Sequence, residues 1–167
     1  SDNYGAATGI LVDQANPHAH GLIKFLNIFG PGPNQIPSGT LILSASLRVD
    51  CYDQGNNLRI YRLNEAWDEA EATWAERSSG VPWSDPGGDG LSSHGATEVT
   101  GDCSATGWRT IDLTAIVQEW SDGQANHGIL LADSGRNGVD ISTSESALPP
   151  ELVIDFPESF NAVETKP

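Results

Sequence analysis

The amino-acid sequence predicts an all-β protein, a β-sandwich of antiparallel sheets with one short helix. Its 167 residues include 18 Gly and 10 Pro, which divide the chain into short segments and favour strands over long helices. Many of these segments alternate apolar and polar residues, as half-buried strands do. Only Thr114–Trp120 has its apolar residues at helical spacing. A chain of this length most simply forms one domain, with enough core to fold independently.

The net charge of the chain restricts the classes of partner that it can bind. The formal net charge is −15, with only 8 Lys and Arg residues. Nucleic acids and anionic membrane surfaces both require basic protein surface, so neither is an expected partner. No apolar stretch approaches the ~20 residues of a transmembrane helix. We expect a soluble protein that acts outside the cell or at its surface, although solubility alone also explains the charge.

Residues 108–132 organise the rest of the chain, since they read as strand, short helix, turn and strand. Ile116, Val117 and Trp120 would share one face of the helix. Asp112 or Thr114 can accept hydrogen bonds from its free N–H groups. Ser121–Asp122–Gly123 should end the helix, and the apolar run at residues 129–131 predicts a buried strand. We expect the helix to close one end of the sandwich.

Further segments carry strand signals, at residues 10–12, 21–29, 40–52, 58–63, 97–100, 139–143 and 151–156. In the longest, the odd-numbered residues from Ala45 to Cys51 would face the core and the even-numbered ones would face away. The Asn/Gly-rich residues 53–57 predict a hairpin loop to the strand 58–63. Alternation breaks near Arg62, which predicts a bulge or a strand end. The long loop at residues 78–93 is of the kind that is functional or mobile.

The two cysteines, Cys51 and Cys103, show no CxxC spacing. In a secreted protein such a pair favours a disulfide. Two buried thiols are the alternative, and ligands at zinc-site spacing are missing from the sequence.

Eight motifs, taken in order, resemble a known family. They are Asn3–Tyr4–Gly5, GLIKF at 21–25, LSASLRV at 43–49, IYRLNEAWDEAEATW at 60–74, PGGD at 86–89, WRTIDLTAIVQEW at 108–120, NHGILL at 126–131 and PPELVIDF at 149–156. The chain resembles the DNRLRE-type domains, which overlap with carbohydrate-binding module family 96. The resemblance implies a secreted jelly-roll β-sandwich over residues 1–157, usually one non-catalytic module of a larger polysaccharide-acting or cell-surface protein. Residues 158–167 then read as a tail or linker.

Two departures from the family pattern stand out. Family members commonly have a strand before the Asn-Tyr-Gly motif, whereas only Ser1 and Asp2 precede it here. We expect that strand to be missing or supplied by another chain. Members also often carry Arg before the Glu that aligns with Glu145, where this chain has Ser144, so any role of that Arg in binding is open here.

Sugar binding requires flat aromatic faces and fixed polar groups. Lys24, Arg48, Arg59 and Tyr61 all lie opposite the aliphatic face of their strands and would form one polar, locally basic sheet face. Such a face could bind uronate or sulfate groups, because Arg binds carboxylates bidentately; pairing of these Arg with nearby carboxylates is the alternative. Trp83, in a Gly/Pro-rich loop, is the best candidate for an exposed aromatic platform, although it could equally be buried under that loop.

The sequence supports other kinds of site, metal or catalytic, less well than sugar binding. Asp53, Asp85 and Asp89 lie in oxygen-rich loops that could hold a structural calcium. His18 and His20 could suit a metal but read better as loop residues. Neither GxSxG nor HExxH occurs, and the carboxylates around Trp67 read as a solvated turn rather than a glycosidase pair. We therefore expect no enzyme.

The leading functional hypothesis is a non-catalytic module that binds an extracellular polysaccharide, with uronate or sulfated glycans as candidates. The alternative is a structural or adhesive module of a surface protein or filament. It would assemble with neighbouring modules or subunits by strand addition, through its curtailed N-terminus and its C-terminal tail.

Overall fold

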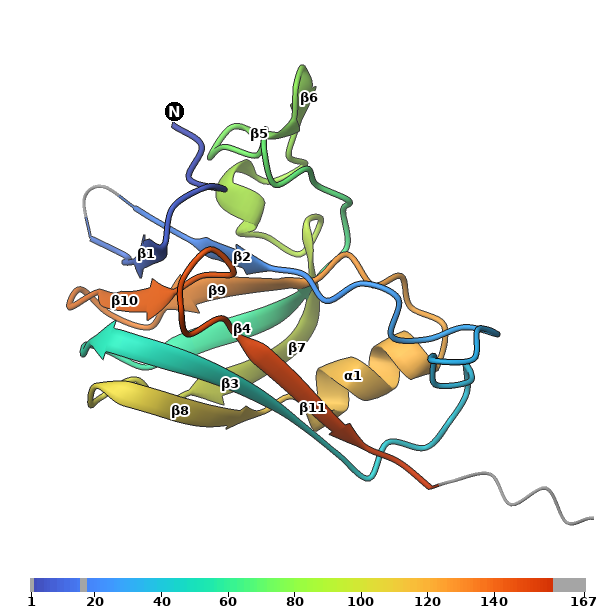
Figure 1. The fold of residues 1–167 in the computed structure, drawn as a ribbon. Helices are drawn as coiled ribbons and strands as arrows, with labels where there is room; N and C mark the ends of the chain where they lie inside the picture. The colour runs from blue at the N-terminus through green and yellow to red at the C-terminus, as the bar shows by residue number, and fades with distance from the viewer. Residues whose placement is uncertain (1, 16–17, 158–167) are drawn as a thin grey trace, which may run out of the picture.

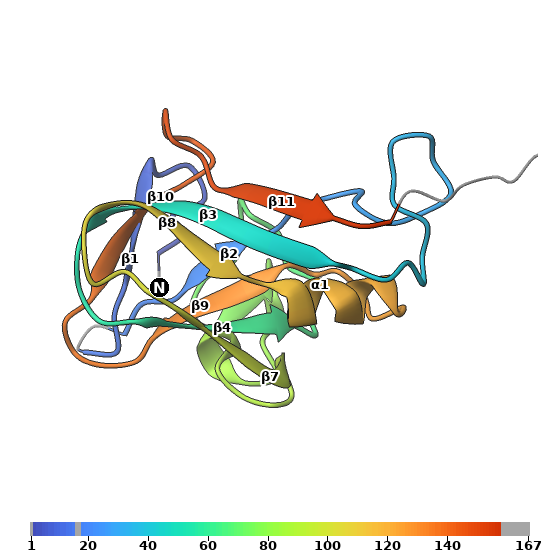
Figure 2. The ribbon, with the colours of Figure 1, turned by 90° about the horizontal axis from the view of Figure 1, so that it is seen from below.

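The computed structural model describes residues 2–15 and 18–157 of the chain. Two antiparallel sheets pack face to face, with one α-helix at one end (Figures 1 and 2). This confirms the predicted all-β sandwich. The expected tail, residues 158–167, lies outside the described residues. Within the part of the chain that is described, no helix has the length and apolar character needed to cross a membrane.

The first sheet is built around the longest strand, β3 (Ser44–Asp53). One edge of β3 pairs with β8 (Gly107–Asp112). Strands β10 (Val139–Ser142) and β11 (Glu151–Asp155) lie one after the other along the opposite edge of β3. Arg48 shows the two edges, since it pairs with Thr110 of β8 on one side and with Glu151 of β11 on the other. The short strand β1 (Gly9–Val12) completes this sheet beside β10.

The second sheet has the order β2, β9, β4, β7. These strands are Gly21–Ile23, Ile129–Asp133, Leu58–Leu63 and His94–Gly101. The register between β4 and β7 shifts between Tyr61 and Leu63, which confirms the irregularity predicted near Arg62. The last strand, β7, leads through residues 102–106 into β8 of the first sheet.

The main core lies between the two sheets. The odd-numbered residues of β3 from Ala45 to Cys51 meet Leu58 and Ile60 of β4, and all are buried. Helix α1 (Thr114–Ser121) closes one end of this core with Ile116, Val117 and Trp120. The Asp112 carboxylate accepts a hydrogen bond from the Thr114 backbone N–H at 2.8 Å, and Gly123 takes a left-handed φ of 105° just after the helix.

Two strand predictions were too long, and one connection was wrong. The strand expected over residues 21–29 ends at Ile23, and the one expected over residues 40–52 begins at Ser44. Residues 53–57 do not form a hairpin loop, because β3 and β4 lie in different sheets. The connection instead crosses from one sheet to the other, and the two strands bury their aliphatic faces into the same core from opposite sides.

Residues 64–93 form a separate layer on the outer face of the second sheet. They contain the small hairpin β5 (Glu76–Ser78) and β6 (Val81–Pro82) and the 3-10 turn η1 (Pro86–Gly88). Figure 2 shows this green segment on the side away from the first sheet. Beneath it lies a second apolar cluster of Tyr61, Leu63, Trp83 and Leu130. The outer face of the second sheet is therefore apolar in part, and the layer buries this apolar part.

A disulfide joins the two halves of the sandwich at one end. It links Cys51 of β3 to Cys103, in the connection from β7 to β8, with a Cα–Cα distance of 6.0 Å. The connection that crosses between the sheets is therefore tied to the central strand of the first sheet.

Candidate functional site

The four polar residues expected on one sheet face do not form one site. Arg48 lies on β3 in the first sheet, whereas Arg59 and Tyr61 lie on β4 in the second. Lys24 follows β2, with its ammonium 4.6 Å from the Trp67 ring centre and donating to the Trp67 carbonyl at 3.1 Å. The prediction of a single basic face was wrong, because it assumed that β3 and β4 are neighbours.

Trp83 is not an exposed platform. Its side chain is only 5% exposed, and its indole N–H donates to the Thr73 carbonyl at 2.9 Å. The Gly- and Pro-rich loop around it folds back over the second sheet, so this tryptophan anchors the loop instead of presenting a face to a ligand.

Arg59 and Tyr61 belong to a compact group with Glu98 of β7. Both Arg59 Nε and Nη2 lie 3.2 Å from the Glu98 carboxylate, and the Tyr61 hydroxyl lies between the two, donating to Glu98 and accepting from Arg59. The Tyr61 ring stacks on His94 with ring centres 4.1 Å apart. Burial, reinforced by the hydrogen bond to Glu98, raises the pKa of Tyr61 to about 12. These groups satisfy one another, so we assign them a structural role.

Two exposed aromatic rings, those of Tyr52 and Trp108, lie instead on the outer face of the first sheet. We call the surface formed by Arg48, Tyr52, Trp108, Thr110 and Glu151 the β3 face. The even-numbered residues of β3 point to this side because the odd-numbered ones fill the core. Trp108 is 37% exposed, and the Arg48 guanidinium lies 4.9 Å from its ring centre. Arg48 Nη1 also lies 2.6 Å from the Glu151 carboxylate.

A cleft of about 500 Å³ adjoins the β3 face at Tyr52. Its other wall is Ser142 at the end of β10 together with Glu145, Ser146 and Leu148 of the connection that follows. The Tyr52 ring is half exposed and lies against Gly9, where any Cβ would overlap it. The connection is held in place because the Ser142 hydroxyl donates to Asp50 at 2.8 Å and the Thr143 N–H donates to the Thr8 carbonyl at 3.2 Å.

Together the face and the cleft offer two accessible aromatic rings, an arginine, hydroxyl groups and carboxylates. Aromatic rings pack against the C–H faces of sugars, and the polar groups can hydrogen-bond their hydroxyls. A comparison with family models agrees with this chemistry, since the model of carbohydrate-binding module family 96 matches residues 1–156. The chain belongs to carbohydrate-binding module family 96. The module is therefore a carbohydrate-binding unit, of a kind that binds its partner without catalysis. No curated protein matches it.

The module does not bring the predicted calcium ligands together. Asp53 ends β3, whereas Asp85 and Asp89 flank η1 in the outer layer, and Asp85 accepts the Ser92 and Ser93 N–H groups at 2.9 and 3.3 Å. Over residues 2–15 and 18–157, no group of three or more His, Cys, Asp and Glu residues is arranged to hold a metal ion. A bound calcium stays a prediction.

The carboxylates near Trp67 serve the outer layer. Glu65 accepts hydrogen bonds from the Ser84 N–H, the Ser84 hydroxyl and the Ser93 hydroxyl, and its carboxylate lies 3.5 Å from Arg77 Nε. Burial opposes ionisation of Glu65, but these hydrogen bonds and the Arg77 charge prevail and lower its pKa. Glu65 therefore fixes the layer that buries Trp83.

Sequence reasoning singled out neither Tyr52 nor Trp108 as a candidate site residue. The alternation of side chains along the strands could have located both. Tyr52 lies on the same side of β3 as Arg48, and Trp108, three residues before the core residue Ile111 on β8, lies on the side away from the core. Glu145 lines the cleft, and the neighbouring Ser144, which stands where family members often carry Arg, lies 3.5 Å from Glu69.

His18 and His20, considered above as a metal pair, pack on Trp74 with ring centres 5.9 and 4.9 Å away. His20 Nδ1 lies 3.0 Å from the Gly87 carbonyl of η1, so the neutral ring can donate there and hold the outer layer to residues 18–20. Burial lowers the pKa of His20, against the opposing effects of the Gly87 bond and the Asp89 charge. Protonation thus costs more in the folded state than in the unfolded chain.

We expect the module to lose stability as the pH falls below about 6.5, the ordinary histidine value, towards the lower folded pKa of His20. His20→Asn keeps a side-chain donor but does not titrate, so its free energy of unfolding should fall less between pH 7 and pH 5. Urea unfolding across this range measures the difference. His127, whose pKa burial also lowers, is present in both proteins, so the difference between them reports on His20 and its charge interactions with His18, His94 and Asp89. If the free energy of unfolding changes equally with pH in the two proteins, His20 is not the group responsible.

Proposed function

We propose that the module binds an acidic extracellular polysaccharide across the β3 face, with Trp108 as the aromatic platform and Arg48 as the group that recognises carboxylate or sulfate. The observation that carries this proposal is the placement of the Arg48 guanidinium over the exposed Trp108 ring. Arg48 stands over one face of this ring, so a sugar that packs on its exposed part would have its substituents within reach of a planar donor that suits such anions.

The Arg48–Glu151 pair does not prevent this role. Its two side chains are 41% and 46% exposed, and ion pairs this exposed contribute only about 0–1 kcal/mol. A uronate or sulfate group can therefore displace Glu151 from Arg48 at little cost. Glu151 also makes the empty face less attractive to anions, and so it tunes the affinity.

The length of the face suits a chain better than a single sugar. Trp108 pairs with Asp50, and Tyr52 lies two residues further along β3. Strand geometry then sets the two Cα atoms about 8 Å apart. Neighbouring sugars of one polysaccharide could contact the two rings, with the cleft beside Tyr52 receiving a substituent.

The location outside the cell is part of the proposal. The Cys51–Cys103 disulfide supports it, because disulfides persist mainly in oxidising compartments. The acidic composition is compatible with it and adds no further support.

Two charge variants test the recognition of acidic groups. Arg48→Ala should weaken binding to alginate or a sulfated galactan by about tenfold. Glu151→Gln should strengthen it roughly threefold, because it frees Arg48 and removes a like charge. Affinity electrophoresis or calorimetry measures both, with and without a chelator to test calcium. Acidic glycans that bind equally to all three proteins would contradict the role of Arg48, and so would binding restricted to neutral glycans.

One observation favours the second candidate, assembly through strand addition. Among the described strands, β11 pairs only with β3, and apolar residues at this edge are exposed, with Leu41, Leu43 and Val153 all more than half accessible. Such an edge can accept a strand from a neighbour. Light scattering across a concentration series tests this, and a strict monomer throughout would count against it.

A further inference from the structure

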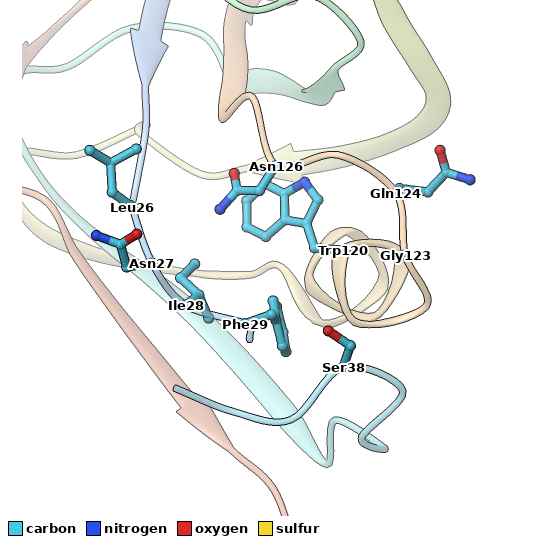
Figure 3. A pocket seen from close by; sticks show the side chains of 9 residues that line it. All are labelled: Leu26, Asn27, Ile28, Phe29, Ser38, Trp120, Gly123, Gln124 and Asn126. Atoms are coloured by element: carbon cyan, nitrogen blue, oxygen red, sulfur yellow. The ribbon is translucent and has the colours of Figure 1, made fainter. Parts of the chain in front are cut away.

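A second hollow, the end pocket, lies away from the β3 face, at the end of the sandwich that α1 closes. Figure 3 shows its lining side chains, which come from the loop after β2, from Ser38, from Trp120 of α1 and from the turn that follows the helix. Its volume is about 410 Å³, within the range of small-ligand pockets. It shares no lining residue with the β3 face or its cleft.

The walls of the end pocket are held by their own hydrogen bonds. Asn126 Nδ2 donates to the Phe25 carbonyl at 2.8 Å, and Asn126 Oδ1 accepts from the Gly128 N–H at 3.0 Å. The loop after β2 is tied to Ile36 twice, since Ile36 N–H donates to Ile28 O at 2.8 Å and Gly30 N–H donates to Ile36 O at 3.0 Å. The pocket is therefore formed before any ligand arrives, which lowers the entropic cost of binding.

Asn27 has an unusual backbone conformation in this wall. Its φ is 59°, the only left-handed value at a non-glycine residue among those described. Asparagine tolerates this conformation better than most residues. The side chain is exposed at the pocket, and Figure 3 shows it beside Leu26 and Ile28, across from Asn126.

The chemistry of the lining is uncharged, which sets it apart in a chain with 23 Asp and Glu residues. Its polar groups are the carboxamides of Asn27, Gln124 and Asn126 and the hydroxyl of Ser38. Phe29 adds aromatic surface, while Trp120 also lines the pocket but is only 3% exposed. A carboxamide both donates and accepts, and so it can pair with the hydroxyls of a sugar. The pocket also adjoins the C-terminal end of α1, the negative end of the helix dipole, which disfavours anions.

We propose that the end pocket binds a neutral sugar unit, as a second carbohydrate site whose chemistry differs from that of the β3 face. This goes beyond the proposed function and does not depend on it, since the two sites share no residue. A module with both sites could engage an acidic and a neutral part of one heteropolysaccharide, or two different chains.

Nuclear magnetic resonance tests the proposal directly, because the side-chain NH2 groups of Asn27, Gln124 and Asn126 give their own signals. The probes are maltose, cellobiose, mannobiose, xylobiose and lactose, with galacturonic acid as the anionic comparison. We expect at least one neutral disaccharide to shift these signals and the Gly123 amide, with millimolar affinity and no dependence on salt. Galacturonic acid should leave these signals unchanged.

Two variants remove the carboxamides of Asn27 and Gln124 without disturbing the walls, which Asn126 helps to hold. Asn27→Gly keeps the left-handed backbone, and Gln124→Ala changes an exposed side chain for which no hydrogen bond is seen in the described structure. Together they should weaken the neutral sugar by about tenfold or more, while Arg48→Ala should leave it unchanged. The proposal is overturned if none of the five sugars shifts the signals, if the double variant binds equally well, or if galacturonic acid binds there as strongly. If the β3 face is not a binding site, acidic glycans will not shift the signals of Tyr52 and Trp108. The two proposals can therefore be refuted independently.

Discussion

Trp108→Ala is expected to remove most binding of the module to its polysaccharide. The partly exposed indole supplies aromatic surface on the β3 face, and it also orients Arg48, whose guanidinium lies 4.9 Å from its ring centre. Aromatic residues at the centre of a binding surface commonly contribute about 2 kcal/mol or more, which is roughly a thirtyfold change in Kd. Calorimetry with the best acidic glycan from the Arg48 and Glu151 comparison measures the loss.

A matched control separates loss of a ligand contact from a general effect of surface truncation. Leu91 is 72% exposed and lies in the outer layer over the second sheet, so Leu91→Ala should bind normally. Trp108→Phe should keep part of the affinity, because it retains a smaller ring. If Trp108→Ala binds as the parent does while its melting temperature is unchanged, the β3 face is not the site.

Removing the disulfide is expected to cause the largest change in stability. Cys51 and Cys103 are separated by 52 positions, and closure of a loop of this length stabilises a fold by about 4 kcal/mol in the chain-entropy treatment. The double variant Cys51→Ala, Cys103→Ala should therefore lower the free energy of unfolding by about that amount. Urea denaturation followed by tryptophan fluorescence measures it.

Chemical reduction supplies the control for this prediction. The parent protein in dithiothreitol should unfold at nearly the same urea concentration as the double variant, while dithiothreitol should not affect the variant itself. A reduced parent that is as stable as the oxidised one would show that the bond contributes little. The effect should reach the binding face, because Cys103 lies only a short turn before Trp108 on β8.

Local sequence patterns predicted the strands well but not their partners. The alternation in β3 and β4 fixed which side of each strand is apolar, and Thr114–Trp120 matched α1 to within one residue. Alternation does not say which sheet a strand joins, however. Because β3 and β4 bury their aliphatic faces into one core from opposite sides, Arg48 and Arg59 end on opposite surfaces of the protein.

The site predictions failed for related reasons. Trp83 lies among turn residues, which usually indicates an exposed loop, but Leu63 and Leu130 form an apolar patch on the outer face of the second sheet that needs a cover. That patch arises only once β4 and β9 pair, so no local window contains it. Tyr52 and Trp108 are far apart in sequence, and their proximity depends on the register of β3 with β8.

The arrangement of strands around β3 has a mechanical consequence. The proposed ligand lies on β3, and the chain leaves the sheet after β11, whose Asp155 pairs with Ser44 at the beginning of β3. Tension on the chain beyond Asp155 would pull β11 lengthwise along β3 and load its paired residues, from Ser44 to Arg48, at the same time instead of peeling them one by one. A shear geometry of this kind resists force well, so the module could hold a polysaccharide under flow without its binding strand being drawn out of the sheet.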